Sequence, residues 1–299
     1  MRIIRRTGVF GALLVVLALV AAACGSGGDT IKVGSTNFTE QEILGEIYAQ
    51  TLEANGYQVE RRFKLGARDV VEPALEAGEI DLYSEYAGTV LEFLNGGAGE
   101  ASGDVDAIVE KLKGRFADRG VTVLDYAPAV DSNALAVTQE TAAKYGLAKI
   151  SDLQAVAGEL VFGGPPECPE RPFCMIGLQT TYGLNFGEFK PLDTGGPITV
   201  AALESGEIDV ALLFSSDGAI AAKGFVVLDD DKHLQPANNI IPIARTDIAD
   251  DKLIGLINSV TAKITTSQLS EMNKLVNIDK EDASVVAHNW LHDNGIVND

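Results

Sequence analysis

A nine-residue segment occurs twice in this chain of 299 residues, and it constrains the fold more than any other feature. Residues 74–82 read ALEAGEIDL and residues 202–210 read ALESGEIDV, with seven identical positions. In both copies a helical pattern ends at a glycine suited to the left-handed position after a helix, and an apolar strand follows at once. Each copy predicts a helix-to-strand corner of an α/β unit, although a generic turn of this kind could also produce the similarity by chance. The spacing of 128 residues is too long for a solenoid, so we expect two related lobes.

Polar residues follow both strands of the repeat. Residues 83–89 read YSEYAGT and residues 214–218 read FSSDG. Ligands of α/β sheets gather at the carboxyl ends of the strands. We therefore expect one ligand site that both lobes face.

The remaining pattern alternates strands and helices. Strands are expected at 31–34, 59–65 and 121–124, and helices at 104–118 and from a capping box at 39–42 to Gly56. Short apolar strands at 134–137 and 240–243 flank the segment with the second repeat. If each carries the chain between lobes, lobe 1 comprises 30–132 and 238–299 and lobe 2 comprises 133–237. The last 50 residues predict two or three helices that return to lobe 1.

The N-terminus has the pattern of an export signal. Three arginines precede an uncharged run over 9–23, which is shorter than the ~20 residues that span a bilayer. The run ends at AAACG (21–25), which resembles a bacterial lipobox. The resemblance implies removal of residues 1–23, lipidation of Cys24 and a short tether over 24–29. The alternative is an ordinary signal peptide with an incidental cysteine.

Cys168 and Cys174 bracket the sequence PERPF. In an oxidising compartment such a pair favours a disulfide. A tetrahedral metal site would need two further ligands, and only Glu167 lies nearby. A redox pair normally has two intervening residues, whereas this one has five. We therefore predict a structural disulfide.

Composition and motifs exclude several classes of function. The net charge of −20 argues against nucleic-acid binding, which needs a basic face. The chain contains no Gly-x-Ser-x-Gly, His-Glu-x-x-His or P-loop pattern. His288 and His292 lie four apart, but Asn289 stands where a zinc protease needs glutamate. We predict no enzyme activity, no metal site and no cofactor.

Four segments carry a family resemblance: GSTNFTEQ (34–41), GEIDLYSEYAGT (78–89), FSSDG (214–218) and GGPPECPERPFC (163–174). The chain resembles the substrate-binding proteins of glycine betaine/choline-type osmoprotectant ABC importers, and the last segment resembles their actinobacterial branch. The resemblance implies an α/β, two-lobed periplasmic-binding-protein type II fold that closes on a small ligand by hinge motion. It also implies a monomer, lipid-anchored on the extracytoplasmic face of the cell membrane, with an ABC permease as partner.

The resemblance also implies site residues. Tyr86 would contact the cation, Thr89 would donate to a ligand carboxylate, Phe214 would supply a second aromatic face, and Arg171 would pair with the carboxylate. Further hydrogen-bonding candidates are Thr36, Asn37, Gln41, Asn133, Thr199 and Asp217.

The chain departs from the family pattern at several of these positions. Relatives often have lysine at the position of Thr36 and a cage tyrosine at the position of Asn133. The cage is therefore expected to be poor in aromatics. Glu40 and Gln41 either face the cleft or belong to the helix cap.

The predicted function is capture of a quaternary ammonium osmoprotectant such as glycine betaine or choline for delivery to the permease. Two alternatives remain open. The same fold could bind a different small polar solute, or the protein could be a ligand-sensing lipoprotein that takes no part in transport.

Overall fold

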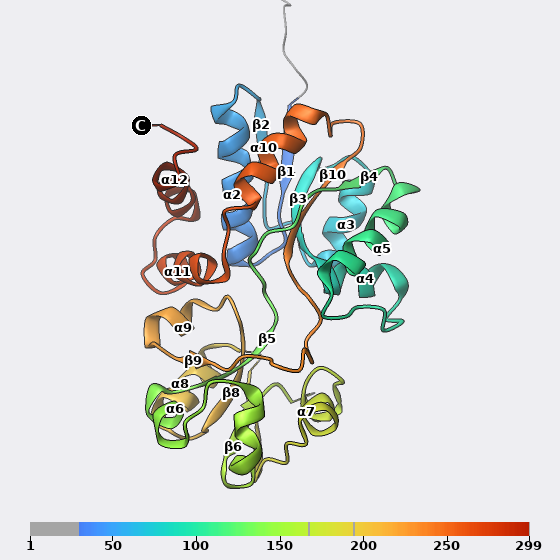
Figure 1. Ribbon diagram of the computed structural model, residues 1–299. Coiled ribbons are helices and arrows are strands. Elements are labelled where there is room, and N and C mark those ends of the chain that lie inside the picture. The colour runs from blue at the N-terminus through green and yellow to red at the C-terminus, as the bar shows by residue number, and fades with distance from the viewer. Residues whose placement is uncertain (1–29, 167, 194, 299) are drawn as a thin grey trace, which may run out of the picture. The chain divides into compact units, whose positions relative to one another are not determined.

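Two five-stranded mixed sheets, each covered by helices, form the part of the chain that the computed structural model describes, residues 30–166, 168–193 and 195–298 (Figure 1). The expected signal peptide, the lipidated Cys24 and the tether lie outside these residues. Within the described ranges, no helix is both long enough and apolar enough to cross a bilayer.

The first sheet has the strand order β2-β1-β3-β10-β4. Its strands are β1 (Ile31–Gly34), β2 (Val59–Arg62), β3 (Leu82–Tyr86), β4 (Val121–Val123) and β10 (Ile240–Arg245). Its helices are α2 (Thr39–Ala54), α3 (Arg68–Glu76), α4 (Ala87–Asn95), α5 (Val105–Ala117), α10 (Asp251–Thr261), α11 (Thr266–Asn277) and α12 (Ala283–Asp293). β10 runs antiparallel to both of its neighbours.

Alternation along the strands divides the first core into two layers. Leu82 and Ile240 pack under α2, α10, α11 and α12, whereas Tyr83 and Ile241 pack under α3, α4 and α5. Successive strand residues point to opposite faces, so consecutive apolar residues fill both layers. Figure 1 shows the two helical layers on opposite sides of this sheet.

The second sheet has the order β7-β6-β8-β5-β9. Its strands are β5 (Asn133–Val137), β6 (Val161–Gly164), β7 (Glu188–Pro191), β8 (Val210–Phe214) and β9 (Val226–Val227). Its helices are α6 (Gln139–Tyr145), α7 (Met175–Tyr182), α8 (Pro197–Ser205) and α9 (Gly218–Lys223), with 3-10 turns η1 (Ile150–Ala155), η2 (Ala157–Glu159) and η3 (Cys168–Glu170). We call each sheet with its helices a lobe, the first and the second in chain order.

The two sheets have equivalent topology, and the sequence repeat marks equivalent corners. α3 leads into β3 through Gly78 (φ +74°), and α8 leads into β8 through Gly206 (φ +75°). Such positive φ values favour glycine. The repeated aspartates make equivalent contacts. The carboxylates of Asp81 and Asp209 each accept a hydrogen bond from a backbone N–H of the neighbouring strand, at 2.8 and 2.9 Å. The prediction of paired helix-to-strand corners is confirmed.

Most expected elements form, with shifted ends and one error. The strand expected over 59–65 ends at Arg62, and the C-terminal region contains three helices. The capping box is wrong. Helix α2 begins at Thr39 with Phe38 as its cap residue, and the Thr39 hydroxyl donates instead to Asn277 Oδ1 of α11 (2.6 Å). The Thr39 hydroxyl therefore makes a tertiary contact with α11 and does not cap the N-terminus of α2.

Two segments cross between the lobes, and they lie antiparallel where Val130 pairs with Asn239. A second connection joins α11 to the start of α9. Asn273 Nδ2 donates to the Ser216 carbonyl (2.9 Å), and Ser270 Oγ donates to the Asp217 carbonyl (2.9 Å). Besides the two chain crossings, α11 of the first lobe therefore links to the start of α9 in the second.

Candidate ligand-binding site

A cavity of about 800 Å³ is lined by residues of both lobes and of the crossing segments. Six of the ten side chains expected at the site line it: Tyr86, Thr89, Asn133, Arg171, Phe214 and Asp217. Tyr86 and Phe214 end strands, and Thr89 and Asp217 follow them, as the repeat suggested. Asn133 instead begins β5, and Arg171 follows η3 in the disulfide loop. The cavity is therefore at the edge where the equivalent strand ends meet.

Thr36, Asn37 and Gln41 do not line the cavity, and neither does Thr199. Thr36 and Gln41 are buried within the first lobe. Thr199 is occupied with Asp193, to which its hydroxyl donates (2.7 Å). From the segment 36–41, the cavity is reached instead by Phe38, Thr39 and Glu40.

Tyr86 ends β3, lines the cavity and is only 6% exposed. Its hydroxyl donates to Glu40 Oε1 (2.7 Å), and its ring stacks on Phe38 at a centroid distance of 6.1 Å. Glu40 Oε2 accepts a second hydrogen bond from Asn273 Nδ2 (2.7 Å). The phenol is thereby fixed by a carboxylate from the first turn of α2.

Three carboxylates line the cavity: Glu40, Asp131 and Asp217. Burial raises the pKa of Glu40, despite the hydrogen bonds it accepts. Burial, followed by repulsion from Glu40, raises the pKa of Asp131 well above its ordinary value. Burial also raises the pKa of Asp217. Raised pKa values mean that ionisation of these groups is costly, and a bound cation would offset that cost.

Four aromatic side chains line the cavity. Phe38, Phe173 and Phe214 are 43%, 36% and 37% exposed, and Tyr86 completes the set. Sequence reasoning named only Tyr86 and Phe214. Phe38 lies inside the quoted segment 34–41 and Phe173 between the two cysteines, so both were visible but had no assigned role. The expectation of an aromatic-poor cage does not describe this cavity.

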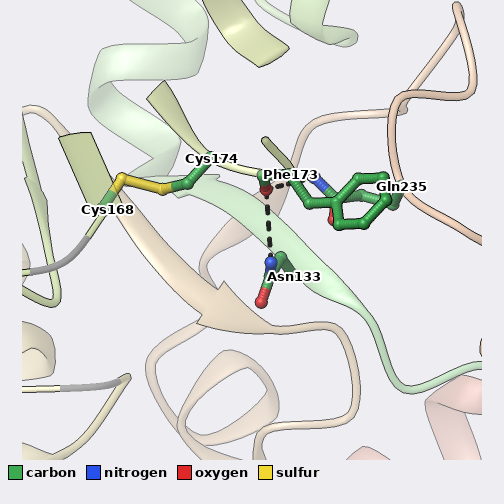
Figure 2. The surroundings of a disulfide bond; sticks show 5 residues. All are labelled: Asn133, Cys168, Phe173, Cys174 and Gln235. Carbon is green, nitrogen blue, oxygen red and sulfur yellow. Dashed lines mark hydrogen bonds between the residues drawn. A yellow bond between two sulfur atoms is a disulfide. The ribbon is translucent and has the colours of Figure 1, made fainter. Parts of the chain in front are cut away.

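The predicted disulfide between Cys168 and Cys174 is confirmed. Figure 2 shows the Phe173 carbonyl beside it, where it accepts hydrogen bonds from Asn133 Nδ2 (3.3 Å) and Gln235 Nε2 (3.0 Å). The loop that presents Arg171 and Phe173 is therefore closed covalently and held by amides from β5 and from a crossing segment. Asn133 thus both lines the cavity and contacts this loop.

A second arginine, Arg68, lines the cavity from the first residue of α3. Its Nε and Nη2 donate to Glu85 Oε1 and Oε2, both at 2.7 Å. Nη2 also donates to Thr89 Oγ1 (3.1 Å), and the Thr89 hydroxyl donates to the Tyr86 carbonyl (3.3 Å). Sequence reasoning missed Arg68, because nothing local shows that it pairs with a carboxylate 17 residues away.

Among the described residues, no cluster of three or more His, Cys, Asp or Glu side chains could hold a metal ion. Two related α/β lobes with an aromatic and charged cavity between them are the architecture of a solute-binding protein.

The comparisons with known proteins identify the family. Residues 29–293 match the substrate-binding domain of ABC-type glycine betaine transport systems, and the chain belongs to this family. It is a family of transport proteins and not of enzymes, whose members serve importers from the extracytoplasmic side.

Individual relatives are similar along nearly their whole length. The glycine betaine-binding protein YehZ of Escherichia coli is 28% identical, over 94% of this chain and 96% of that protein. The carnitine transport binding protein OpuCC of Listeria monocytogenes is 29% identical, over 96% of both.

Solved structures agree with this. The structure of a glycine betaine/carnitine/choline ABC transporter protein superposes with a TM-score of 0.82 at 26% identity, over 90% of this chain and 100% of that one. Apo YehZ superposes with a TM-score of 0.81 at 27% identity, with the same coverage.

Proposed function

We propose that this protein captures a zwitterionic quaternary ammonium solute, such as glycine betaine or carnitine, and delivers it to an ABC permease. The observation that carries the proposal is a single cavity with four aromatic side chains, three carboxylates and two arginines. A quaternary ammonium cannot donate hydrogen bonds, so aromatic faces and negative potential must hold it. A carboxylate needs cationic donors. The cavity supplies both kinds of group.

The cationic head would rest against Tyr86 and Phe214, with Phe38 and Phe173 as further aromatic walls. Tyr86 and Phe38 come from the first lobe, and Phe173 and Phe214 from the second. Closure of the lobes would enclose the head between these rings and exclude water, which strengthens cation–π contacts.

The anionic end would meet Arg171, which lines the cavity from the disulfide loop. Arginine suits this role, because its planar fork binds a carboxylate with two hydrogen bonds. Asn133 supports the loop, and Asp217 adds to the negative potential around the cation. Both would act without direct contact with the carboxylate.

We further propose the organisation around the site: lobe 1 over 30–132 and 238–299, and lobe 2 over 133–237. All strands of each sheet fall within these ranges. Residues 1–23 would be a signal peptide and Cys24 the lipidated residue of a membrane-anchored monomer, as the lipobox-like sequence suggests. The cysteine-bracketed loop supports placement in the actinobacterial branch.

A larger betaine is the second candidate ligand. A cavity of about 800 Å³ is roomy for a molecule as small as glycine betaine. One relative, 26% identical over 89% of this chain, is an ergothioneine transport permease/ergothioneine-binding protein of Helicobacter pylori. The chain corresponds to 48% of that protein.

Isothermal titration calorimetry tests the proposal. The purified protein, freed of carried-over ligand, is titrated with glycine betaine, carnitine, choline and ergothioneine, and with glycine as the matched control. Glycine has the same carboxylate as glycine betaine but an ammonium that can donate hydrogen bonds. Saturable binding of a trimethylammonium compound that also has a carboxylate, without binding of glycine, supports the proposal. If folded, ligand-free protein binds no member of the panel, the proposal is wrong.

A further inference from the structure

Arg68 is a charged group of the cavity that the family resemblance did not assign. Its side chain is 25% exposed and lines the cavity next to Thr89. It lies in the first lobe, whereas Arg171 lies in the second. The cavity therefore contains one guanidinium from each lobe.

A buried carboxylate fixes the orientation of Arg68. Glu85 is only 1% exposed, and besides Arg68 it accepts hydrogen bonds from the Tyr83 hydroxyl and the Tyr86 backbone N–H, both at 3.0 Å. The two parallel hydrogen bonds from Nε and Nη2 hold the guanidinium plane. A group positioned in this way loses little entropy when it binds a ligand.

One edge of the guanidinium is left for a ligand. Arginine has five N–H donors, of which those on Nε and Nη2 serve Glu85 and Thr89. Among the described residues, none accepts a hydrogen bond from Nη1 of Arg68. Nη1 therefore carries two N–H groups on a side chain that already borders the cavity.

Thr89 does not compete for this role. Its hydroxyl accepts from Arg68 Nη2 and directs its own proton to the Tyr86 carbonyl. Thr89 Oγ1 therefore links the Arg68 guanidinium to the backbone carbonyl of Tyr86, so Arg68 lies next to the residue proposed to contact the cation.

We propose that Arg68 is a specificity-determining residue, whose Nη1 donates to the anionic group of a zwitterionic ligand while Glu85 holds its other edge. This inference rests on the proposed function. It predicts preference for ligands with a carboxylate close to the quaternary nitrogen. Closure would bring Arg171 to the same carboxylate from the second lobe.

Two ligands isolate this effect. Glycine betaine and choline share the trimethylammonium head, but glycine betaine has a carboxylate where choline has a hydroxymethyl group. The quantity measured is the ratio of the Kd of choline to that of glycine betaine. The test variant is R68Q combined with E85Q, because removal of Arg68 alone would strand a buried charge.

We expect the ratio to fall by about tenfold or more in the double variant, through weaker glycine betaine binding, as for loss of a charge-assisted hydrogen bond. Arg68→Lys keeps the positive charge and a partner for Glu85, but it lacks the Nη1 group that would donate to the ligand, so the ratio should fall in this variant as well. Arg68→Lys therefore tests the inference even if the double variant does not fold.

Three results would overturn the inference. An unchanged ratio in Arg68→Lys or in the folded double variant means that Arg68 does not read the carboxylate. A ratio that collapses only in Arg171→Gln assigns the carboxylate to the second lobe alone. If wild-type protein binds neither ligand, the inference fails, and the titration with the full panel then shows separately whether the proposed function fails as well.

Discussion

Removal of the hydrogen bond between Tyr86 and Glu40 should lower the stability of the protein but leave most of its ligand affinity. Tyr86→Phe removes the hydroxyl that donates to Glu40 at 2.7 Å and keeps the ring. A hydrogen bond to a charged group contributes about 1.5–3 kcal/mol, and loss of the donor leaves the buried carboxylate with fewer side-chain partners, Ser216 and Asn273. The thermal midpoint should fall by about 2–4 °C for each kcal/mol lost.

The same variant should leave the cation-facing surface in place. We expect Tyr86→Phe to retain most of the affinity for glycine betaine, because the ring still stacks on Phe38. Tyr86→Ala removes the ring as well, and a desolvated cation–π contact contributes about 2 kcal/mol, which is roughly a thirtyfold change in Kd. Calorimetric titration gives the Kd, and scanning calorimetry of the ligand-free protein gives the midpoint.

The pH dependence of the stability loss provides an internal control. Burial raises the pKa of Glu40, so acidification protonates it in the folded protein before an exposed glutamate would be protonated. A neutral acceptor gains less from the tyrosine hydroxyl than a carboxylate does. The midpoint difference between wild type and Tyr86→Phe should therefore shrink as pH falls. Tyr86→Phe binding as weakly as Tyr86→Ala, with an unchanged midpoint, would refute this division of roles.

Three further predictions concern stability. Gly218→Ala places a Cβ 2.4 Å from the backbone of α11, so it should lower the free energy of unfolding by about 1–3 kcal/mol and weaken ligand binding. The control is Gly255→Ala, whose Cβ meets nothing within 4 Å and which should leave stability in denaturant melts unchanged or raise it. Replacing both Cys168 and Cys174 with serine should lower the unfolding free energy by about 2 kcal/mol and weaken ligand affinity; equal affinity would show that the bridge does not organise the site. Burial raises the pKa of Glu72 from 4.5 to about 7, so the folded state binds this proton more tightly than the unfolded state does. Wild type should therefore lose stability relative to Glu72→Gln as pH rises from about 4.5 to about 7, and a constant difference between pH 4.5 and pH 8 would contradict the reasoning.

Local chemistry explains what could be predicted from the sequence. The repeat placed two equivalent corners correctly, because a glycine after a helix and an apolar strand behind it form through interactions of neighbours in the chain. The aspartates of the repeat have a structural reason that appears only in the sheet, where Asp81 and Asp209 each accept an N–H from the next strand. The short cysteine spacing likewise allowed the disulfide to be predicted.

The site was less predictable, because its members are chosen by contacts between distant segments. Glu40 and Gln41 are adjacent in α2, and the sequence could not tell which faces the cavity. The structure selects Glu40, whose carboxylate meets Tyr86 and Asn273, 46 and 233 residues further along the chain. Phe173 was overlooked because its place depends on Asn133 and Gln235.

The sequence alone determined the family, the paired α/β corners, the bridged loop and the strand ends at which ligand-facing groups gather, since all of these follow from short motifs. Only the tertiary structure decided which side chains share the cavity and which partners hold them. Arg68 is the clearest case. From the sequence it is an ordinary helix-start residue, and the packing of α3 against β3 gives its guanidinium a buried carboxylate on one side and the cavity on the other.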